Sequence, residues 1–244
     1  MAIVLYQYPG GDGVGSVSPP CLRVDMALRW LGVEFERRNL RRGGEVRNVS
    51  RTGRLPVIDI DGERFVESTR ILDELERRHD VPWTVESERD AAHLRIWEYA
   101  INEYYYWCGY YIRWIDLAGR ERFLTALLGR AGWFTRFMVE KTFVPKQVRR
   151  AMLHGAGGRK KEDVFAEIER GLQLLVTELR GGPFLLGRDR PSRADLTVCS
   201  LFSQAGYHDT MPDVMRMVED TGVIKPYMQR IWDTVGGEKP RWLS

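Results

Sequence analysis

The sequence is poor in cysteine, with three in 244 residues. Cys21, Cys108 and Cys199 lie far apart along the chain, so they form neither a disulfide framework nor a paired zinc site. This usage is typical of a reducing compartment, and we expect a cytoplasmic protein. The four histidines are isolated from one another, with none at helical ligand spacing from a second His or Cys. We therefore expect no metal site.

Long apolar runs and an excess of one charge are also missing. No stretch approaches the roughly 20 uninterrupted apolar residues that span a bilayer, and the start MAIVLYQYPGG resembles no leader peptide. We therefore expect neither export nor a membrane anchor. With 37 Lys+Arg against 34 Asp+Glu, the chain is close to neutral. Its basic clusters favour a solvated surface that attracts anionic ligands over a nucleic-acid site. These clusters are Arg41, Arg42, Arg47, Arg51 and Arg54 in one loop, and 159–161 further on.

Aromatic residues, in contrast, are plentiful. Eight Trp and ten Tyr supply flat apolar surface for a core, an interface or a cavity. Seven of the aromatics fall close together between 104 and 114, in a segment with a helical pattern. Tyr106 and Tyr110, four residues apart, should share one face of that helix and are our candidates for the wall of an apolar pocket.

The first 80 residues have a mixed pattern. An apolar run at 2–8 predicts a strand, 21–31 an amphipathic helix and 33–40 a second strand, followed by a polar, Arg-rich loop through Arg54. Two short apolar runs then flank Asp61-Gly62, a dipeptide that favours a tight antiparallel hairpin. A helix is expected at 68–79. The order is therefore βαβ followed by ββα.

Beyond Pro82 only helical patterns persist. We place a linker at about 79–85, where the periodicity changes, and divide the chain into domains 1–80 and 86–244. The glycine-rich loop after the first strand has neither the spacing of a dinucleotide fingerprint nor a phosphate-binding lysine, so a plain connector is the better interpretation.

Three short motifs carry the candidate chemistry. The first is Ser18-Pro19-Pro20-Cys21 at the head of the first helix, where free N–H groups and the helix dipole favour a thiolate. The alternative is that Ser18 simply caps the helix and Cys21 is a small buried residue. The second is Leu55-Pro56, because a proline there needs a strand edge or a cis bond. The third is Glu67-Ser68, which either binds a carboxylate or caps the next helix.

Together these motifs resemble the glutathione transferases. The matching stretches are SPPCLRV, GRLPV, ES and GRDRPSRADL, and they span nearly the whole chain. The last resembles the family's capping box and buried aspartate, here Ser192 and Asp195. HGAGGRKKEDV and the stretch after it also look like the metaxin and failed-axon-connections branch of the superfamily. The resemblance implies a thioredoxin-like α/β domain followed by an all-α domain, a cytoplasmic homodimer, and glutathione as co-substrate.

The resemblance also implies roles for individual residues. The backbone of Leu55 before Pro56 would pair with the cysteinyl part of glutathione, Glu67 and Ser68 would hold its γ-glutamyl end, and Arg54 its glycyl carboxylate. Ser18 aligns with the position that carries the catalytic cysteine in related classes, and Cys21 with the second position of that motif. Tyr6 and Tyr8, at the end of the first strand, are further candidates for the catalytic group.

The resulting hypothesis is a glutathione transferase that conjugates glutathione to a small hydrophobic electrophile, in a detoxification role. Two alternatives stay open. One is a non-catalytic, metaxin-like adaptor that retains only the scaffold. The other is a glutathione-dependent thiol transferase that uses Cys21.

Overall fold

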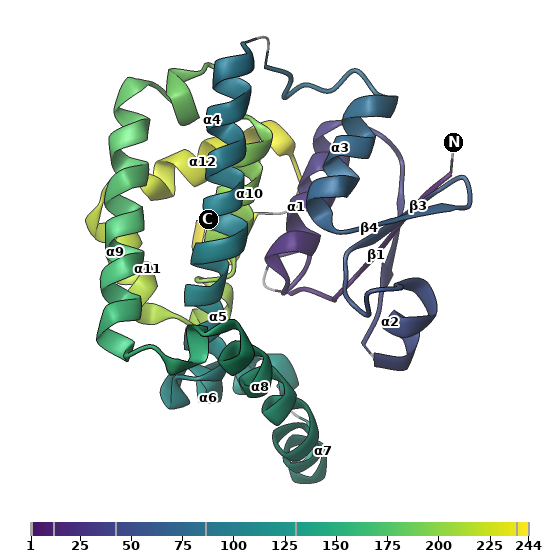
Figure 1. Cartoon of the computed structure of the whole chain (residues 1–244), viewed down its shortest axis with the longest axis vertical. Helices are drawn as coiled ribbons and strands as arrows, with labels where there is room; N and C mark the ends of the chain where they lie inside the picture. The colour runs from purple at the N-terminus through teal and green to yellow at the C-terminus, as the bar shows by residue number, and fades with distance from the viewer. Residues whose placement is uncertain are drawn as a thin grey trace.

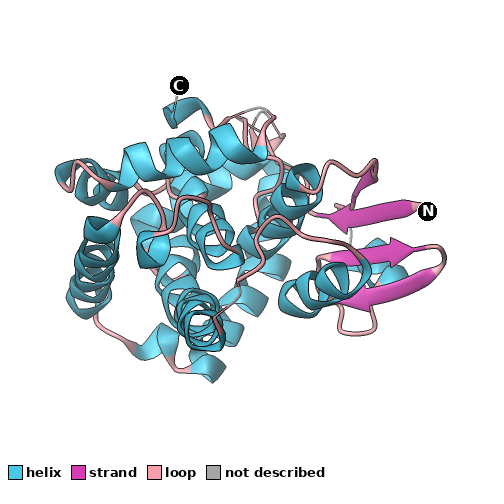
Figure 2. Cartoon of the chain, turned by 90° about the horizontal axis from the view of Figure 1, so that it is seen from above, coloured by secondary structure: helices cyan, strands magenta, loops and turns pink. Residues whose placement is uncertain are grey.

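The computed structural model describes residues 2–11, 13–41, 43–85, 87–129, 131–237 and 239–243. Arg42 of the predicted basic loop lies outside this set. Figures 1 and 2 show a small sheet with its helices on one side of the molecule and a larger group of helices on the other. The fold class expected from the sequence, a thioredoxin-like α/β unit followed by helices, is confirmed for the described residues.

The α/β unit runs to residue 78. Its elements are β1 (Ile3–Gln7), α1 (Pro19–Trp30), β2 (Glu36–Asn39), α2 (Gly43–Val49), β3 (Val57–Ile60), β4 (Glu63–Val66) and α3 (Ser68–Arg78). The strand order is β2-β1-β3-β4, with β1 parallel to β2 and antiparallel to β3. The predicted hairpin is present, and Asp61 (φ 52°) and Gly62 (φ 91°) adopt the positive φ values that its turn needs.

The prediction of a plain loop between 41 and 54 was wrong, because α2 lies within it. The helix is short, begins with Gly43-Gly44 and presents exposed polar side chains, so it has almost no periodic apolar signal. It forms because Val46 is buried in a small cluster with Cys21 of α1 and Leu55 of the loop before β3. Tertiary packing thus outweighs weak local propensity.

From residue 88 onward the described residues form helices and no strand, as expected from the sequence. They are α4 (Glu88–Tyr99), α5 (Tyr106–Trp114), α6 (Leu117–Leu128), α7 (Trp133–Met138), α8 (Val144–His154), α9 (Lys161–Glu178), α10 (Arg193–Ser203), α11 (Pro212–Asp220) and α12 (Ile224–Val235). A π-helical turn, Ala100–Tyr105, joins α4 to α5, so the aromatic run lies on one continuous long helix. A second such turn, Val139–Phe143, joins α7 to α8.

Two features of this arrangement position the site. First, α1 packs between the sheet and the helices, and the main apolar core includes residues of α1, α3, α10 and α12. Second, α7 and α8 project downward from the helical group, with α6 at its base (Figure 1). We call residues 117–154 the lobe. The segment between α3 and α4 joins the two units, and we propose the domain division 1–80 and 86–244 on that basis.

Candidate functional site

The head of α1 is the first component of the site. Pro19 and Pro20 occupy its first turn, where no intrahelical N–H bond is lost. Ser18 is the N-cap residue with extended dihedral angles (φ −111°, ψ 117°), yet its side chain makes no capping hydrogen bond. The Ser18 N–H donates to Ser16 Oγ (3.3 Å), and Ser16 Oγ donates to the carbonyl of Tyr8 (2.7 Å). These bonds fix the backbone at Ser18. Its half-buried hydroxyl is not used as a helix cap and lies within hydrogen-bond reach of Cys21.

Cys21 lies one turn further on and is fully buried. It packs with Tyr6, Leu55 and Val57 beneath the loop before β3. Burial raises the pKa of its thiol to about 11, although hydrogen bonds from Ser18 and from the Tyr8 backbone oppose this. A buried thiol that stays protonated at neutral pH is a poor nucleophile. The geometry favours Ser18 over Cys21 as the group that meets a ligand.

The loop before β3 is the second component. The Leu55–Pro56 bond is cis, which is one of the two arrangements that the sequence requires for this proline. Leu55 is buried, and no hydrogen bond between described residues uses its backbone N–H or C=O. Arg54 beside it is exposed, and its own N–H donates to Ser50 Oγ at 3.1 Å. The loop thus presents unused peptide groups next to a guanidinium.

The start of α3 is the third component. Glu67 is exposed and has a positive φ of 71°, which is unusual for a residue with a side chain. Ser68 follows at the first helical position, and its hydroxyl oxygen accepts a hydrogen bond from Nη2 of Arg23 at 2.7 Å. Because the guanidinium occupies an acceptor site of this oxygen, the Ser68 O–H is left to donate to a ligand.

Arg23 therefore links the first and third components. It is fully buried on α1 and also donates to Thr69 Oγ1 (2.9 Å) and Thr197 Oγ1 (3.0 Å). Its charge is balanced by Glu98 of α4 at 3.5 Å, which Arg193 approaches to 2.5 Å. The sequence analysis missed Arg23, because its partners lie 45 to 174 residues away and no local pattern connects them.

The two tyrosines of β1 differ. Tyr6 is buried, and its hydroxyl accepts from Arg38 Nη1 at 3.3 Å on the β2 side. Tyr8 is half-buried, and burial raises the pKa of its hydroxyl, with a smaller upward effect from Cys21. Arg150 and Arg54 act in the opposite direction on this pKa, so both guanidiniums are near Tyr8. Of the two tyrosines, Tyr8 is therefore the better placed to contact a ligand at the head of α1.

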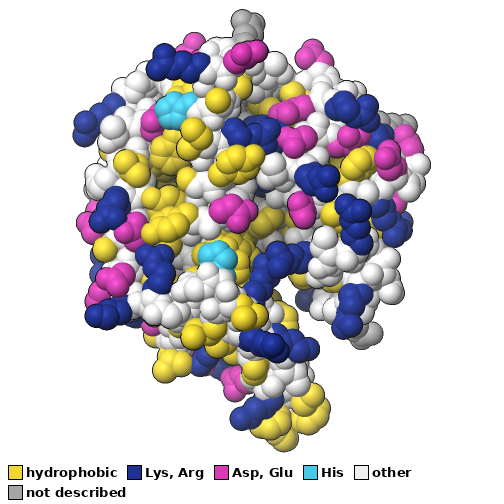
Figure 3. Space-filling model, in the orientation of Figure 1, with side chains coloured by type: hydrophobic (Ala, Val, Ile, Leu, Met, Phe, Trp, Pro, Cys, Tyr) yellow, Lys and Arg dark blue, Asp and Glu magenta, His cyan; other side chains and the backbone are white. Residues whose placement is uncertain are grey.

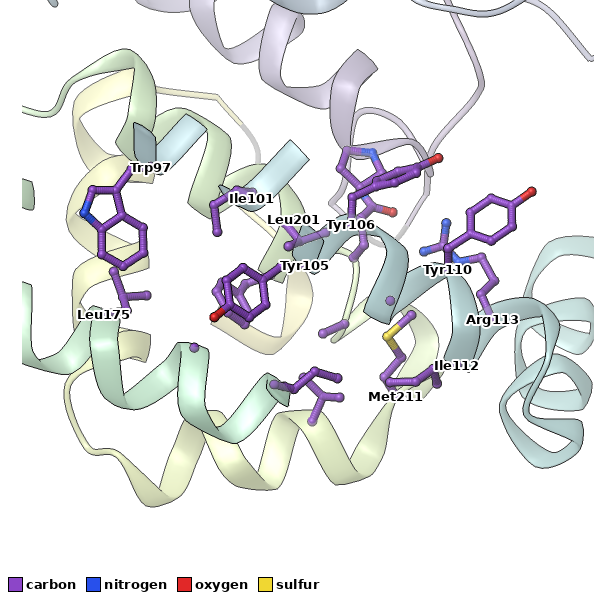
Figure 4. A pocket seen from close by; sticks show the side chains of 18 residues that line it. Trp97, Ile101, Tyr105, Tyr106, Tyr110, Ile112, Arg113, Leu175, Leu201 and Met211 are labelled. Atoms are coloured by element: carbon purple, nitrogen blue, oxygen red, sulfur yellow. The ribbon is translucent and has the colours of Figure 1, made fainter. Parts of the chain in front are cut away.

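An apolar pocket lies beside the head of α1 (Figure 4). Tyr106 and Tyr110 both line it, with ring centroids 5.9 Å apart, as does Pro19 of α1. Arg113 also reaches it and donates to the carbonyl of Val17 at 3.2 Å, directly before Ser18. Burial lowers the pKa of Arg113 to about 10. The predicted pocket residues therefore lie together, next to the candidate catalytic serine.

The hydroxyl of Tyr110 donates to Gln147 Oε1 at 2.5 Å, and burial raises the pKa of Tyr110 to about 12. Tyr110 therefore stays neutral and attaches the long helix to α8 of the lobe. Among the described residues, no three His, Cys, Asp or Glu side chains are arranged to hold a metal ion. Nor does the described part of the chain contain a helix that is both long and apolar enough to cross a membrane.

The α/β unit matches a known protein family. Residues 16–83 match the family model of the glutathione S-transferase N-terminal domain. Residues 16–83 belong to the glutathione S-transferase N-terminal domain family. The match begins just before Ser18 and ends after α3, so all three components of the site lie inside the family's domain.

Two curated relatives align with most of the chain. The failed axon connections protein of Drosophila melanogaster is 28% identical over 84% of this chain, which corresponds to half of that protein's length. An isoprene-epoxide glutathione S-transferase from Rhodococcus sp. (strain AD45) is 25% identical over 89% of this chain and 96% of its own. Among solved structures, human glutathione S-transferase T1-1 matches with a TM-score of 0.65 and 19% identity, over 96% of this chain and 84% of that one. This last likeness concerns the fold alone.

Proposed function

We propose that this chain is a glutathione transferase that conjugates glutathione to a small hydrophobic electrophile. The observation that carries the proposal is the Ser18 hydroxyl. It stands at the N-terminus of α1 without serving as a cap, and Pro19 next to it lines the apolar pocket. The dipole of a helix N-terminus and a hydroxyl donor beside it stabilise a thiolate, and the pocket offers a place for an apolar partner of that thiolate.

Glutathione would be held by the other two components. The N–H and C=O of Leu55 suit the cysteinyl peptide group, and the Ser68 hydroxyl suits the γ-glutamyl carboxylate. Arg54 suits the glycyl carboxylate, and the Glu67 carboxylate suits the γ-glutamyl ammonium. Each assignment matches an unused donor or acceptor to a group of opposite kind on the tripeptide.

The chemistry needs a glutathione thiolate near Ser18. An unperturbed thiol has a pKa of about 8.5, so only a few per cent is ionised near neutral pH. Each unit by which the site lowers this pKa corresponds to about 1.4 kcal/mol. The Ser18 O–H would donate to the sulfur and the dipole of α1 would favour its negative charge. The thiolate would then attack an electrophile positioned against Tyr106 and Tyr110.

Glutathione binding tests the proposal directly. Titration calorimetry should show a 1:1 complex, and Ser68→Ala should weaken it by about tenfold or more, the effect of losing one hydrogen bond to a charged group. Ser87→Ala is the matched control, because Ser87 caps α4 away from the site. The rate of conjugation of 1-chloro-2,4-dinitrobenzene should likewise fall in Ser68→Ala and stay unchanged in Ser87→Ala. A chain that neither binds glutathione nor reacts would contradict the proposal.

The adaptor alternative is favoured by one specific observation. The lobe carries exposed aromatic and apolar side chains that belong to none of the core clusters of the described residues: Trp133, Phe134, Phe137 and Met138. Together with the similarity to failed axon connections, this surface supports a protein-binding role. Failure to bind immobilised glutathione, with a stable protein partner recovered through the intact lobe but not through a Trp133→Ala, Phe134→Ala variant, would favour the adaptor.

The remaining expectations follow from the superfamily. We propose a homodimer, and sedimentation that gives a monomer at micromolar concentration would contradict it. We also propose a reducing compartment, such as the cytoplasm, because all three cysteines are free and buried. The thiol transferase alternative requires an accessible Cys21, and a mixed disulfide with glutathione visible by intact mass would revive it.

A further inference from the structure

A second, strongly basic cleft lies between the lobe and the loop before β3. Its lining consists of Arg54, Trp107, Lys146, Arg149, Arg150, Leu153 and His154. Figure 3 shows Lys and Arg side chains gathered along the lobe and along the edge of the α/β unit that faces it, on either side of a hollow. The cleft therefore combines three guanidiniums, one ammonium and an imidazole, without a carboxylate in its described lining.

The described part of the chain supplies no counter-ion to four of these cations. No ion pair between described residues involves Arg54, Lys146, Arg149 or Arg150. In the same lobe, by contrast, Arg136 is paired with both Glu121 and Glu140. Cations of one sign held near one another repel, and a bound anion relieves that repulsion. The missing counter-charge indicates an anionic ligand.

The positions of the cations are fixed by packing. The rings of Trp107 and His154 are stacked with centroids 3.7 Å apart and an angle of 13° between them. Gln147 of α8 accepts the hydroxyl of Tyr110 on α5. Arg149 and Arg150 lie between these two attachments and Lys146 directly precedes Gln147, and the three cations have the i, i+3, i+4 spacing of a single helix face. The lobe therefore holds these three cations at a defined place against the long helix.

The cleft also adjoins the site described above. The Arg150 guanidinium lies 5.5 Å from the centroid of the Tyr110 ring, which lines the apolar pocket. Arg54 belongs to the loop that carries Leu55 and Pro56, and Arg54 and Arg150 both act on Tyr8. Tyr110 thus separates an apolar pocket from a basic cleft, with the candidate thiolate position beside them.

We infer that the electrophilic substrate carries an anionic oxyacid group, such as a carboxylate or sulfonate, on an apolar body. The cations of α8, Lys146, Arg149 and Arg150, hold the anionic group, while Arg54 stays with the glycyl carboxylate of glutathione. The pocket of Tyr106 and Tyr110 holds the apolar body. This inference rests on the proposed function and narrows its substrate class from any small hydrophobic electrophile to an amphipathic anion. The lobe then acts as a specificity element.

Binding of two unreactive ring compounds tests the inference without turnover. 3,5-Dinitrobenzoate and 1,3-dinitrobenzene differ by one carboxylate, and both can be followed by quenching of tryptophan fluorescence. We expect the carboxylate to bind about tenfold more tightly at low ionic strength, with the preference falling as salt is added. In a Lys146→Ala, Arg149→Ala variant the preference should fall to about twofold or less, while 1,3-dinitrobenzene binds as before.

An Arg136→Ala, Lys141→Ala variant is the matched control, because it removes the same charge from the lobe outside the cleft. It should keep the preference for the carboxylate. Equal binding of the two compounds by the unmodified chain, or equal loss in the two double variants, would overturn the inference. So would full competition between glutathione and 3,5-dinitrobenzoate, because the cleft would then belong to glutathione. Failure to bind glutathione at all, with the anion preference intact, would instead count against the proposed function.

Discussion

Arg23 provides the sharpest test of how the site is supported. Its guanidinium donates to Ser68, Thr69 and Thr197 at 2.7, 2.9 and 3.0 Å and faces Glu98 at 3.5 Å. Arg23→Met keeps the apolar stem and removes all of these contacts. Glu98 would keep Arg193 and Arg95 as partners, while the Ser68 hydroxyl would lose the donor that fixes its orientation.

Two separable effects are expected. Breaking a buried ion pair on one side costs roughly 3–5 kcal/mol of folding free energy. Loss of the fixed Ser68 donor should cost about 1 kcal/mol of glutathione binding, which is a roughly fivefold increase in Kd. Urea unfolding measures the first effect, and titration calorimetry on the folded protein measures the second.

Arg193→Met is the control for this prediction. Arg193 belongs to the same network, with Asp73 at 2.7 Å, Glu76 at 2.9 Å and Glu98 at 2.5 Å, but it does not contact the Ser68 side chain. It should lower stability comparably and leave glutathione affinity unchanged. Arg23→Lys, which keeps the charge but not the planar fork, should weaken binding with less loss of stability. Equal weakening of glutathione binding by Arg23→Met and Arg193→Met would refute a positioning role for Arg23.

Three further outcomes are expected. Native protein should show almost no thiol that reacts with 5,5′-dithiobis(2-nitrobenzoate) within minutes, and denatured protein should show three. The reason is that Cys21, Cys108 and Cys199 are buried, and burial raises the pKa of Cys21 to about 11. Rapid labelling of Cys21 would contradict this expectation. Asp195→Ala should lower the free energy of unfolding, measured with urea, by about 3–6 kcal/mol, because it leaves three buried donors without an acceptor. These donors are Ser192 N–H, Leu185 N–H and Tyr227 O–H. A loss below about 1 kcal/mol would show that the capping box is dispensable. Burial alone would raise the pKa of Asp73, but Arg193 and Arg95 outweigh it and lower that pKa below 3.8. The contribution of Asp73 is therefore present above about pH 4 and lost as pH falls through the lowered value, so the urea midpoint of the unmodified chain should fall more steeply below pH 4 than that of Asp73→Asn; parallel curves would show that Asp73 contributes nothing.

Local patterns were sufficient for much of the fold. The hairpin at Asp61-Gly62, the βαβ order and the long aromatic helix all follow from periodicity and turn chemistry, which act over a few residues. Helix α2 did not follow, because Val46 is its single buried residue and the packing partners of Val46 come from distant segments.

The sequence indicates the candidate site only where a motif marks it. Ser18, Leu55 and Ser68 each begin or precede an element, so capping and proline rules identify them. Arg23, Arg113 and the cations of α8 lie inside helices, where a charged residue has no local signature of function. Their roles depend on contacts between α1, α3, α5 and α8 that exist only after folding.

The most direct test of the central claim is the ionisation of bound glutathione. The ultraviolet absorbance of the thiolate, followed against pH, should show that bound glutathione ionises at a lower pH than free glutathione. Ser18→Ala should raise that pH and lower turnover with little change in Kd, and Cys21→Ala should have a milder effect. If Cys21→Ala abolishes activity while Ser18→Ala leaves ionisation and turnover intact, the assignment of Ser18 is contradicted. If neither change matters and glutathione still binds, Tyr8, and then Tyr6, becomes the group to replace.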